Sequence, residues 1–514
     1  MRYQNRKMGR RMLLVSGGIL LSKCLGLARD MVFAYVWGTS TVLAAFILAF
    51  TVPNLLRALF GEGAFNAAFV PLFNDKLETE SRQSAWDFSS RILTSTALVL
   101  VLITAALVGG TLLIRPFAPN ELSRLTLELL PWLLPYGILI CLTAGVASML
   151  NSIGRFGVPA YAQALLNVCL IAAALGLAPL FGVKDDRQIY ALVIAVLGAG
   201  LLQLAVNAWA CRRSGWRYRL PAKLRSPEVT RFTALLTPIL IGTGVVQLNV
   251  LVDRILAGYL GEIATTTLYY SQRLVYLPVG LFGVAMGTVC LPAMSRAWAN
   301  RDREGVAESL RFSLEQVLFL AVPAAVALGI LRVPIIRLLF ERGDFSAAGT
   351  SETAWTLMFY IGGIPAFAAA KIATTPFHAR QDTRTPVKVA AFCLSINVIL
   401  NLILMQFIRQ GGLALSTAVA SWINVLMLLY FARSSIGNLG LRFVLSPVAK
   451  ITGAAALAGL SMHFCLRGVD ILALSGFTGK FMACAIPLVA GGVIYVIATL
   501  LLGCSHIKQI LGRG

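Results

Sequence analysis

Long runs of apolar residues recur from one end of the 514-residue chain to the other. A run of about 20 apolar residues crosses the hydrocarbon core of a bilayer as an α-helix. Strands of a membrane barrel would instead alternate apolar and polar residues over about ten positions. The runs therefore predict an all-α polytopic membrane protein with fourteen transmembrane helices, at residues 12–37, 40–60, 88–114, 126–152, 159–182, 189–211, 229–259, 263–291, 313–340, 352–377, 386–408, 411–433, 445–466 and 482–503.

The composition agrees with this pattern. Hydrophobic residues make up 58% of the chain, charged residues make up 13%, and the mean hydropathy is +0.79. A soluble domain carries about 25% charged residues, so the composition excludes a soluble protein that follows a signal peptide.

The basic residues predict how the chain is oriented. The formal net charge is +22, and most Lys and Arg residues lie in the N-terminal segment and in alternate loops. Because cytoplasmic loops are enriched in Lys and Arg, both termini are expected in the cytoplasm, with an even number of spans. The same rule accounts for the positive charge without nucleic acid as a partner.

Motifs of enzymatic chemistry are missing from the sequence. It contains no GxxxxGK[ST] phosphate-binding loop, no nucleophile elbow and no HExxH motif. The nine cysteines form no CxxC pair, and the three histidines are too dispersed for a metal cluster. We therefore expect a protein that is not an enzyme. Any transport would draw on an ion gradient or on the membrane potential.

The first twelve predicted spans resemble two copies of a six-helix unit. The second span runs into GAFNAAFVPLF and the eighth runs into VAMGTVCLPAM, while LNSIGRFGVPAYA corresponds to FHARQDTRTPVKVA. Such a parallel repeat predicts two pseudo-symmetric six-helix lobes around a central cavity. The expected parts are residues 1–225, 226–440 and 441–514, the last with two extra helices. Chance similarity between apolar helices is the alternative.

Ionisable residues interrupt several predicted spans. The first span contains Lys23, Arg29 and Asp30. A charge at the bilayer centre costs about 2.5–3.5 kcal/mol on insertion scales, so such residues normally face an interior cavity and pair there. Lys23 and Asp30 are one heptad apart and share a helix face, and Arg29 is close enough to Asp30 to pair with it. Other spans contain or end near Arg57, Glu62, Arg273 and Lys371.

These cations predict a cavity for an anion. Its lining would be Lys23, Arg29, Arg57 and Arg273, with Asp30, Glu62 and Lys371 in supporting positions. A planar guanidinium matches phosphate oxygens with two parallel hydrogen bonds, so several arginines favour phosphate or pyrophosphate over a neutral ligand. The alternative is that the cations extend along the helices to the membrane surface, which applies best to Arg254 in the seventh span and next to Lys371.

A second polar set lies in the seventh and eleventh predicted spans, at Asp253, Asn397 and Asn401. The two asparagines are four residues apart and share a helix face. A carboxylate with carboxamide oxygens suits a hard cation such as Na⁺. Hydrogen bonding between helices is the alternative. We expect no other cofactor.

Four stretches resemble a known family closely. LGLARD, PNLLRALFGEGAFNAAFVP, YYSQRLVYLPVGLFGVAMGTVCLP and RQDTRTPVK are similar to motifs of the MurJ (MviN) family of bacterial lipid II flippases, in the MOP exporter superfamily. The resemblance covers essentially the whole chain. It implies that lipid II, the undecaprenyl-pyrophosphate-linked peptidoglycan precursor, moves from the cytoplasmic to the periplasmic leaflet by alternating access. It also implies a bacterial inner-membrane protein whose last two helices hold the lipid tail.

The resemblance assigns roles to residues as well. It matches the essential arginines of the family to Arg29, Arg57 and Arg273, and the Na⁺ ligands of some members to Asp253, Asn397 and Asn401. This chain departs from the family at Lys23 and Ala58, where arginine is common, and at Ala44, where an acidic residue is common. These departures predict a less densely charged cavity.

Expected partners are lipid II, membrane lipids and the cell-wall synthesis machinery, and the expected oligomeric state is a monomer. Two alternatives lie in the same superfamily: a polysaccharide-repeat flippase, which also handles a lipid pyrophosphate, and a MATE-type drug/cation antiporter, which should have acidic residues in its cavity. A third alternative is a scaffold for cell-wall synthesis that transports nothing, which would have no need of buried cations.

Overall fold

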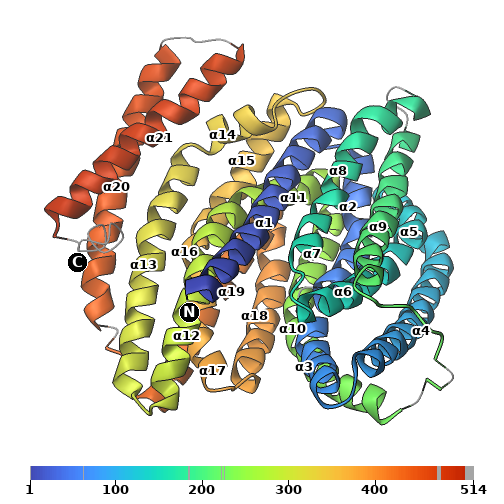
Figure 1. The fold of residues 1–514 in the computed structure, drawn as a ribbon. Helices are drawn as coiled ribbons and strands as arrows, with labels where there is room; N and C mark the ends of the chain where they lie inside the picture. The colour runs from blue at the N-terminus through green and yellow to red at the C-terminus, as the bar shows by residue number, and fades with distance from the viewer. Residues whose placement is uncertain are drawn as a thin grey trace. The chain divides into compact units, whose positions relative to one another are not determined.

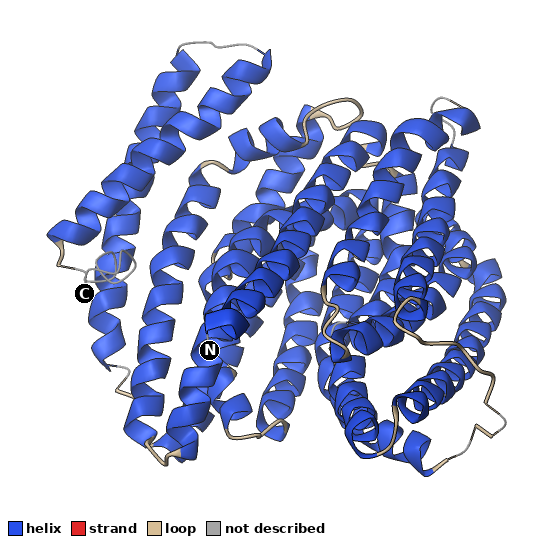
Figure 2. Ribbon diagram, in the orientation of Figure 1, coloured by secondary structure: helices blue, strands red, loops and turns tan. Residues whose placement is uncertain are grey.

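The computed structural model describes residues 2–61, 63–182, 186–221, 223–224, 226–440, 442–471 and 476–503. The regular secondary structure of these residues is helical throughout, without strands (Figure 2). The chain divides into two compact units, Met1–Glu262 and Ile263–Gly514.

The first unit contains the helices coloured from blue to green in Figure 1. They are α1 (Arg2–Trp37), α2 (Thr41–Leu56), η1 (Arg57–Gly61), α3 (Ala64–Thr79), α4 (Arg82–Ile114), η2 (Arg115–Phe117), α5 (Glu121–Leu133), α6 (Pro135–Ser152), α7 (Gly157–Ala162), α8 (Ala164–Ala172), η3 (Ala173–Leu177), η4 (Ala178–Phe181), η5 (Asp186–Gln188), α9 (Ile189–Arg212) and α10 (Pro227–Leu260).

The second unit contains the remaining helices, coloured from light green to red in the same figure. They are α11 (Glu262–Pro278), η6 (Val279–Gly283), α12 (Val284–Ala299), α13 (Arg303–Ile330), α14 (Arg332–Leu339), α15 (Ala347–Ile361), α16 (Ile364–Ala373), α17 (Thr375–Ala379), α18 (Arg384–Ile408), α19 (Gln410–Ile436), α20 (Arg442–Ile471) and α21 (Gly476–Leu501).

Eleven helices in the described part of the chain are long and apolar enough to cross a membrane. The count is twelve if Ala347–Ile361 and Ile364–Ala379, which are bent by 42° relative to each other, form one span. These segments coincide with twelve of the fourteen predicted spans. The other two, 12–37 and 263–291, are also helical, as α1 and as α11, η6 and α12. The chain is thus an all-α polytopic membrane protein, and the exact count of fourteen stays a prediction.

The segments that suggested an internal repeat have similar local structures. In each unit a helix is followed by a five-residue π-helical turn, η1 or η6, and then by a 16-residue helix, α3 or α12. Each of these 16-residue helices contains a proline, Pro71 or Pro292. Single π-helical turns inside α-helices are rare, and those that occur lie frequently at functional sites. The match in local structure supports the predicted correspondence between GAFNAAFVPLF and VAMGTVCLPAM.

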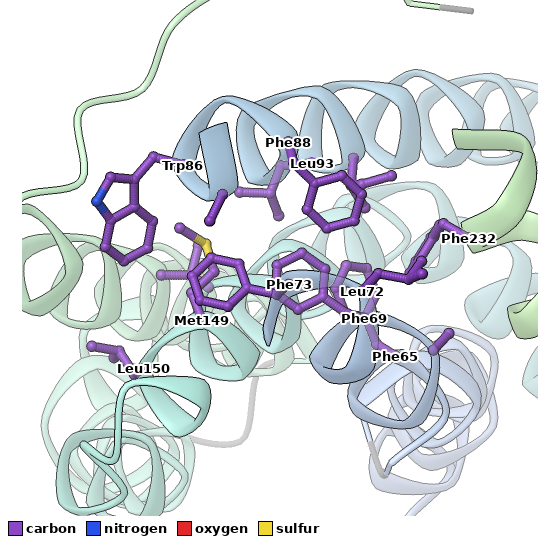
Figure 3. Packing of buried hydrophobic residues seen from close by; sticks show 14 of the residues in the cluster. Phe65, Phe69, Leu72, Phe73, Trp86, Phe88, Leu93, Met149, Leu150 and Phe232 are labelled. Carbon is purple, nitrogen blue, oxygen red and sulfur yellow. The ribbon is translucent and has the colours of Figure 1, made fainter. Parts of the chain in front are cut away.

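An aromatic core holds α3, α4 and α10 together in the first unit (Figure 3). Phe65, Phe69 and Phe73 are four residues apart, so they project from one face of α3. They pack against Phe232 of α10, Phe88 of α4 and Trp86 of α4, at centroid separations of 5.2, 5.5 and 5.4 Å respectively. Each such pair contributes about 0.5–1.5 kcal/mol beyond its buried area.

The basic segment between α9 and α10 is attached to this same unit. Trp216 is buried, and its Nε1 donates a hydrogen bond to Oγ of Ser90 in α4 at 3.3 Å. Glu228 at the start of α10 pairs with Lys76 of α3 at 2.6 Å and with Arg91 of α4. The helix α10 therefore packs within the first unit, although the predicted division assigns it to the second lobe. That division into 1–225, 226–440 and 441–514 stays a prediction.

The two extra helices, α20 and α21, belong to the second unit, where they pack beside α13 (Figure 1). The alanines Ala454, Ala455 and Ala458 let α20 approach its neighbours closely. The hydroxyl of Tyr495 in α21 donates a hydrogen bond to the carbonyl oxygen of Phe319 in α13 at 2.6 Å. The lipid-tail role of these helices remains a prediction.

Candidate functional site

Arg29 lies in α1, the helix in which the sequence places the densest charge. Its side chain is buried, and Asp30 beside it is only 1% exposed. The guanidinium donates two hydrogen bonds to Oδ1 of Asp30, from Nε at 3.0 Å and from Nη2 at 2.7 Å. The predicted pairing of these two residues is confirmed. It explains how α1 accommodates both charges, because their mutual attraction offsets part of the cost of burying each.

Asn167 of α8 holds the same guanidinium from the other side. Its Oδ1 accepts a hydrogen bond from Nη1 of Arg29 at 3.0 Å, and its Nδ2 donates to the carbonyl oxygen of Ser22 in α1 at 3.0 Å. Asn167 is itself 7% exposed. The carboxamide thus ties α8 to α1 and fixes the plane of the guanidinium. Sequence reasoning missed this residue, because an asparagine 138 positions away in an apolar run gives no sign of its partner.

Aromatic rings link Arg29 to the next helix. The guanidinium carbon lies 5.6 Å from the ring centroid of Phe33, one turn further along α1. Phe33 packs edge-on against Phe46 of α2, with the centroids 6.1 Å apart. A cation over an aromatic face gains about 0.5–1 kcal/mol at exposed sites and more where water is excluded. These contacts fix α1 against α2, the helix that leads to Arg57.

The other two predicted cations of the first unit are more accessible. Arg57 is half-buried at the start of η1, and its Nε donates a hydrogen bond to Oδ1 of Asn54 at 2.8 Å. Asn54, one turn earlier, is a further partner that the sequence reasoning did not name. Lys23 is exposed on α1. Glu62, predicted to support this group, lies outside the described residues.

Arg273 belongs to the second unit, in α11. Its guanidinium carbon lies 4.8 Å from the ring centroid of Tyr269, and its Nη2 donates a hydrogen bond to the hydroxyl of Tyr269 at 3.3 Å. These two residues are one helical turn apart, so the tyrosine supports the arginine from within the same helix. The arginine side chain is exposed. It presents its charge in a defined orientation at the surface of the second unit.

Lys371 is exposed on α16 in the same unit. This helix meets η6 very closely, since a Cβ on Gly283 would lie 3.1 Å from Cα of Ala368. Gly283 is therefore needed for the packing of η6 against α16, whatever the role of Lys371.

The predicted Na⁺ ligands divide between the two units. Asp253 is buried in α10 of the first unit, whereas Asn397 and Asn401 are fully buried in α18 of the second. Nδ2 of Asn401 donates to Oδ1 of Asn397 at 2.9 Å, and Nδ2 of Asn397 donates to the hydroxyl of Thr417 in α19 at 3.4 Å. These contacts fit the alternative of hydrogen bonding between helices. Among the described residues, no three His, Cys, Asp or Glu side chains cluster as a metal site.

The RQDTRTPVK stretch is organised around Asp382. Its carboxylate accepts hydrogen bonds from the backbone N–H and the hydroxyl of Thr385, at 3.0 and 2.7 Å, and from Nη2 of Arg380 at 2.6 Å. Partial burial raises the pKa of Asp382, but these bonds outweigh it and lower the pKa to about 2. The motif therefore fixes the loop that leads into α18, which is a structural task.

The first unit thus combines a buried, oriented guanidinium with two more accessible cations, and the second unit contributes Arg273 and Lys371. Such groups bind and orient anions. The prediction that Lys23, Arg29, Arg57 and Arg273 share one ligand stays a prediction, as does the supporting role of Asp30, Glu62 and Lys371.

Comparison with known proteins agrees with the sequence resemblance. The profile of the family described as "Lipid II flippase MurJ" matches residues 33–484. A probable lipid II flippase MurJ of Rhizobium tropici is 35% identical over 506 residues, which cover 95% of this chain and 93% of the relative. A lipid II flippase MurJ of Burkholderia cenocepacia is 33% identical over 483 residues, which cover 90% of each chain.

Solved structures give the same result for the fold. A structure described as lipid II flippase MurJ in an inward closed conformation superimposes with a TM-score of 0.78 at 26% identity, covering 98% of this chain and all of the other. An inward-facing MATE multidrug transporter of the MOP superfamily superimposes with a TM-score of 0.69 over 84% of this chain, but at 15% identity it shares the fold alone. The length of the profile match and the identity to the two relatives show that this chain belongs to the lipid II flippase MurJ family.

Proposed function

We propose that this protein translocates lipid II from the cytoplasmic to the periplasmic leaflet of the bacterial inner membrane. The transport would proceed by alternating access, with the lipid pyrophosphate bound in a cationic central cavity by Lys23, Arg29, Arg57 and Arg273. The observation that carries the proposal is the buried guanidinium of Arg29, held by Asp30 and Asn167. Membership of the lipid II flippase family supports the choice of substrate.

Arginine at position 29 suits a pyrophosphate for a physical reason. The guanidinium remains charged at any physiological pH and donates along a plane, so its direction matters as much as its charge. Asp30 and Asn167 hold that plane, which reduces the side-chain entropy lost on binding. Asp30 also compensates the charge while the anion is absent, since an unpaired buried charge costs about 3–5 kcal/mol.

Three further aspects are part of the same proposal. Na⁺ would bind at Asp253, Asn397 and Asn401, whose carboxylate and carboxamide oxygens suit a hard cation. Both termini would lie in the cytoplasm, as the basic loops indicate. The protein would act as a monomer, with membrane lipids around it and the cell-wall synthesis machinery as a further partner.

The test is complementation of a bacterial strain depleted of its own lipid II flippase. Wild type, Arg29→Ala and Arg29→Lys are compared at equal membrane levels, with Arg124→Ala as control because Arg124 is an exposed arginine of α5. We expect rescue by wild type and by Arg124→Ala, no rescue by Arg29→Ala, and weak rescue by Arg29→Lys. Full rescue by Arg29→Ala would refute the role of Arg29. Failure of wild type in that host would point to a different lipid-linked substrate.

A further inference from the structure

A polar pocket lies at one end of the second unit, apart from the residues described above. Its volume is about 510 Å³, within the roughly 300–1,000 Å³ typical of small-molecule sites. The lining comes from the beginnings of α11, α15 and α19 and from the end of α18. The side chains that matter for recognition are Glu352, Trp355, Phe407, Arg409 and Gln410.

The position of this pocket indicates the side of the membrane on which it opens. The basic segments after α12 and after α17 lie at the opposite ends of these same helices. Because basic segments face the cytoplasm, the orientation expected from the sequence places the pocket on the periplasmic side. That is the side to which the proposed function delivers the headgroup of the lipid.

The polar part of the pocket is fixed in place. Gln410 is 4% exposed, and its Nε2 donates a hydrogen bond to Oε2 of Glu352 at 2.7 Å. A carboxylate accepts about four hydrogen bonds and a carboxamide oxygen about two, so this pair retains acceptors for the hydroxyl groups of a ligand. A pre-oriented pair of this kind loses little entropy on binding.

The apolar part of the pocket is aromatic. Trp355 is 45% exposed and packs edge-on against Phe359, with the centroids 4.9 Å apart. Phe407 is 78% exposed. Flat apolar rings beside a few hydrogen-bonding groups are the usual composition of a ligand site, and they match a sugar ring, which has apolar C–H faces and polar edges.

Arg409 occupies a strained position at this pocket. It is the only residue between α18 and α19, and its φ is +47°. A non-glycine residue in a disfavoured conformation costs about 1–3 kcal/mol, and such residues cluster at ligand sites. Glycine at this position would remove the strain, and the chain has glycines two and three residues later, at Gly411 and Gly412. The strained residue thus coincides with the lining of the pocket.

We propose that this pocket binds a sugar ring of the lipid-linked headgroup on the periplasmic side of the membrane. The ring lies against Trp355 and Phe407, and its hydroxyls donate to Glu352 and Gln410. The proposal rests on the proposed function, because it takes its ligand from that function. It differs in location and chemistry from the pyrophosphate site of Arg29, since it recognises the sugar and not the phosphates.

Two lipids distinguish binding of the sugar from binding of the pyrophosphate. Lipid II carries sugars on its pyrophosphate, whereas undecaprenyl pyrophosphate carries none. The dissociation constants of both are measured with the full chain in lipid nanodiscs, for wild type, Trp355→Leu and Glu352→Gln. Trp132→Leu is the matched control, because Trp132 of α5 is also exposed, at 60%. Glu352→Gln keeps a partner for Gln410 and removes the charge, so it tests the pocket even if Trp355→Leu folds poorly.

We expect Trp355→Leu to weaken lipid II binding roughly five- to tenfold and Glu352→Gln to weaken it roughly threefold. Both should leave the affinity for undecaprenyl pyrophosphate within about twofold of wild type. Equal losses for the two lipids, or equal effects of Trp355→Leu and Trp132→Leu, would overturn the sugar site. If Arg29→Ala weakens both lipids while the two pocket variants change neither, the pocket proposal fails and the proposed function stands. If wild type does not bind lipid II, both fail.

Discussion

Replacement of Asn167 by leucine should disorient Arg29 without removing its charge. Leucine has a similar size and a high helix propensity, so α8 should persist. It can neither accept the hydrogen bond from Nη1 of Arg29 nor donate to the carbonyl oxygen of Ser22. Asp30 would still orient the guanidinium, through the bonds that it accepts from Nε and Nη2 of Arg29.

The expected loss of free energy follows from the two hydrogen bonds that Asn167→Leu removes. A hydrogen bond to a charged group contributes about 1.5–3 kcal/mol, and a neutral one contributes about 0.5–1.5 kcal/mol. The sum of the two contributions, about 2–4.5 kcal/mol, is an upper bound because neighbouring groups relax. If the charged bond alone sets the orientation needed for pyrophosphate, its loss weakens binding roughly tenfold or more.

The assay is lipid II affinity in nanodiscs, followed by complementation and thermal unfolding of the same variants. Asn207→Leu is the control, because Asn207 is likewise a buried asparagine, but its Nδ2 donates to the carbonyl oxygen of Gln203 within its own helix α9, at 2.8 Å. Asn167→Asp should give an intermediate affinity, since it keeps an acceptor for Arg29 but adds a negative charge. The reasoning is refuted if Asn167→Leu and Asn207→Leu lower stability equally and leave lipid II affinity equal to that of wild type.

The remaining predictions concern three other positions. Arg273→Lys should reduce transport, because the planar guanidinium that stacks on Tyr269 is lost. Tyr269→Phe should change transport little, because it keeps the ring and loses only the hydroxyl. A transport assay in which Tyr269→Phe is the more damaging change would contradict this prediction. Asp253→Ala should abolish any dependence of transport on Na⁺, and an unchanged dependence would exclude the proposed cation site. Asp382, with its pKa lowered to about 2 from 3.8, should stabilise the fold above about pH 4 by at most on the order of 2 kcal/mol and lose that contribution as the pH falls towards 2. Asp382→Asn should therefore lower the melting temperature at pH 7, and the difference from wild type should shrink in acid. A difference that does not change with pH would contradict a stabilising role of the Asp382 carboxylate.

The residues that the sequence could and could not identify differ in a consistent way. Arg29 and Asp30 were found because charges in an apolar run are costly and therefore conspicuous. Asn167 and Asn54 were missed because an uncharged polar residue in a helix has several ordinary roles, and only its partner distinguishes them. Asp382 lies within the RQDTRTPVK motif, but only the hydrogen bonds that it accepts reveal its structural role.

The periodicity and length of the apolar runs by themselves determined the class of the protein. A chain with this composition must satisfy its backbone in hydrocarbon, so helices of spanning length follow from the sequence alone. The positions of the buried charges, and the basic residues between the helices, are likewise local properties of the chain.

Tertiary structure decided which helices meet. The aromatic contact of Phe232 with Phe65 and the ion pairs of Glu228 join α10 to α3 and α4, and no pattern in the sequence of α10 indicated these partners. The tertiary structure also brings Asn167 to Arg29, and it directs Nδ2 of Asn401 to Oδ1 of Asn397. The physical reason is that apolar helices have nearly interchangeable surfaces, so small residues, aromatic pairs and polar contacts between distant segments select the partner.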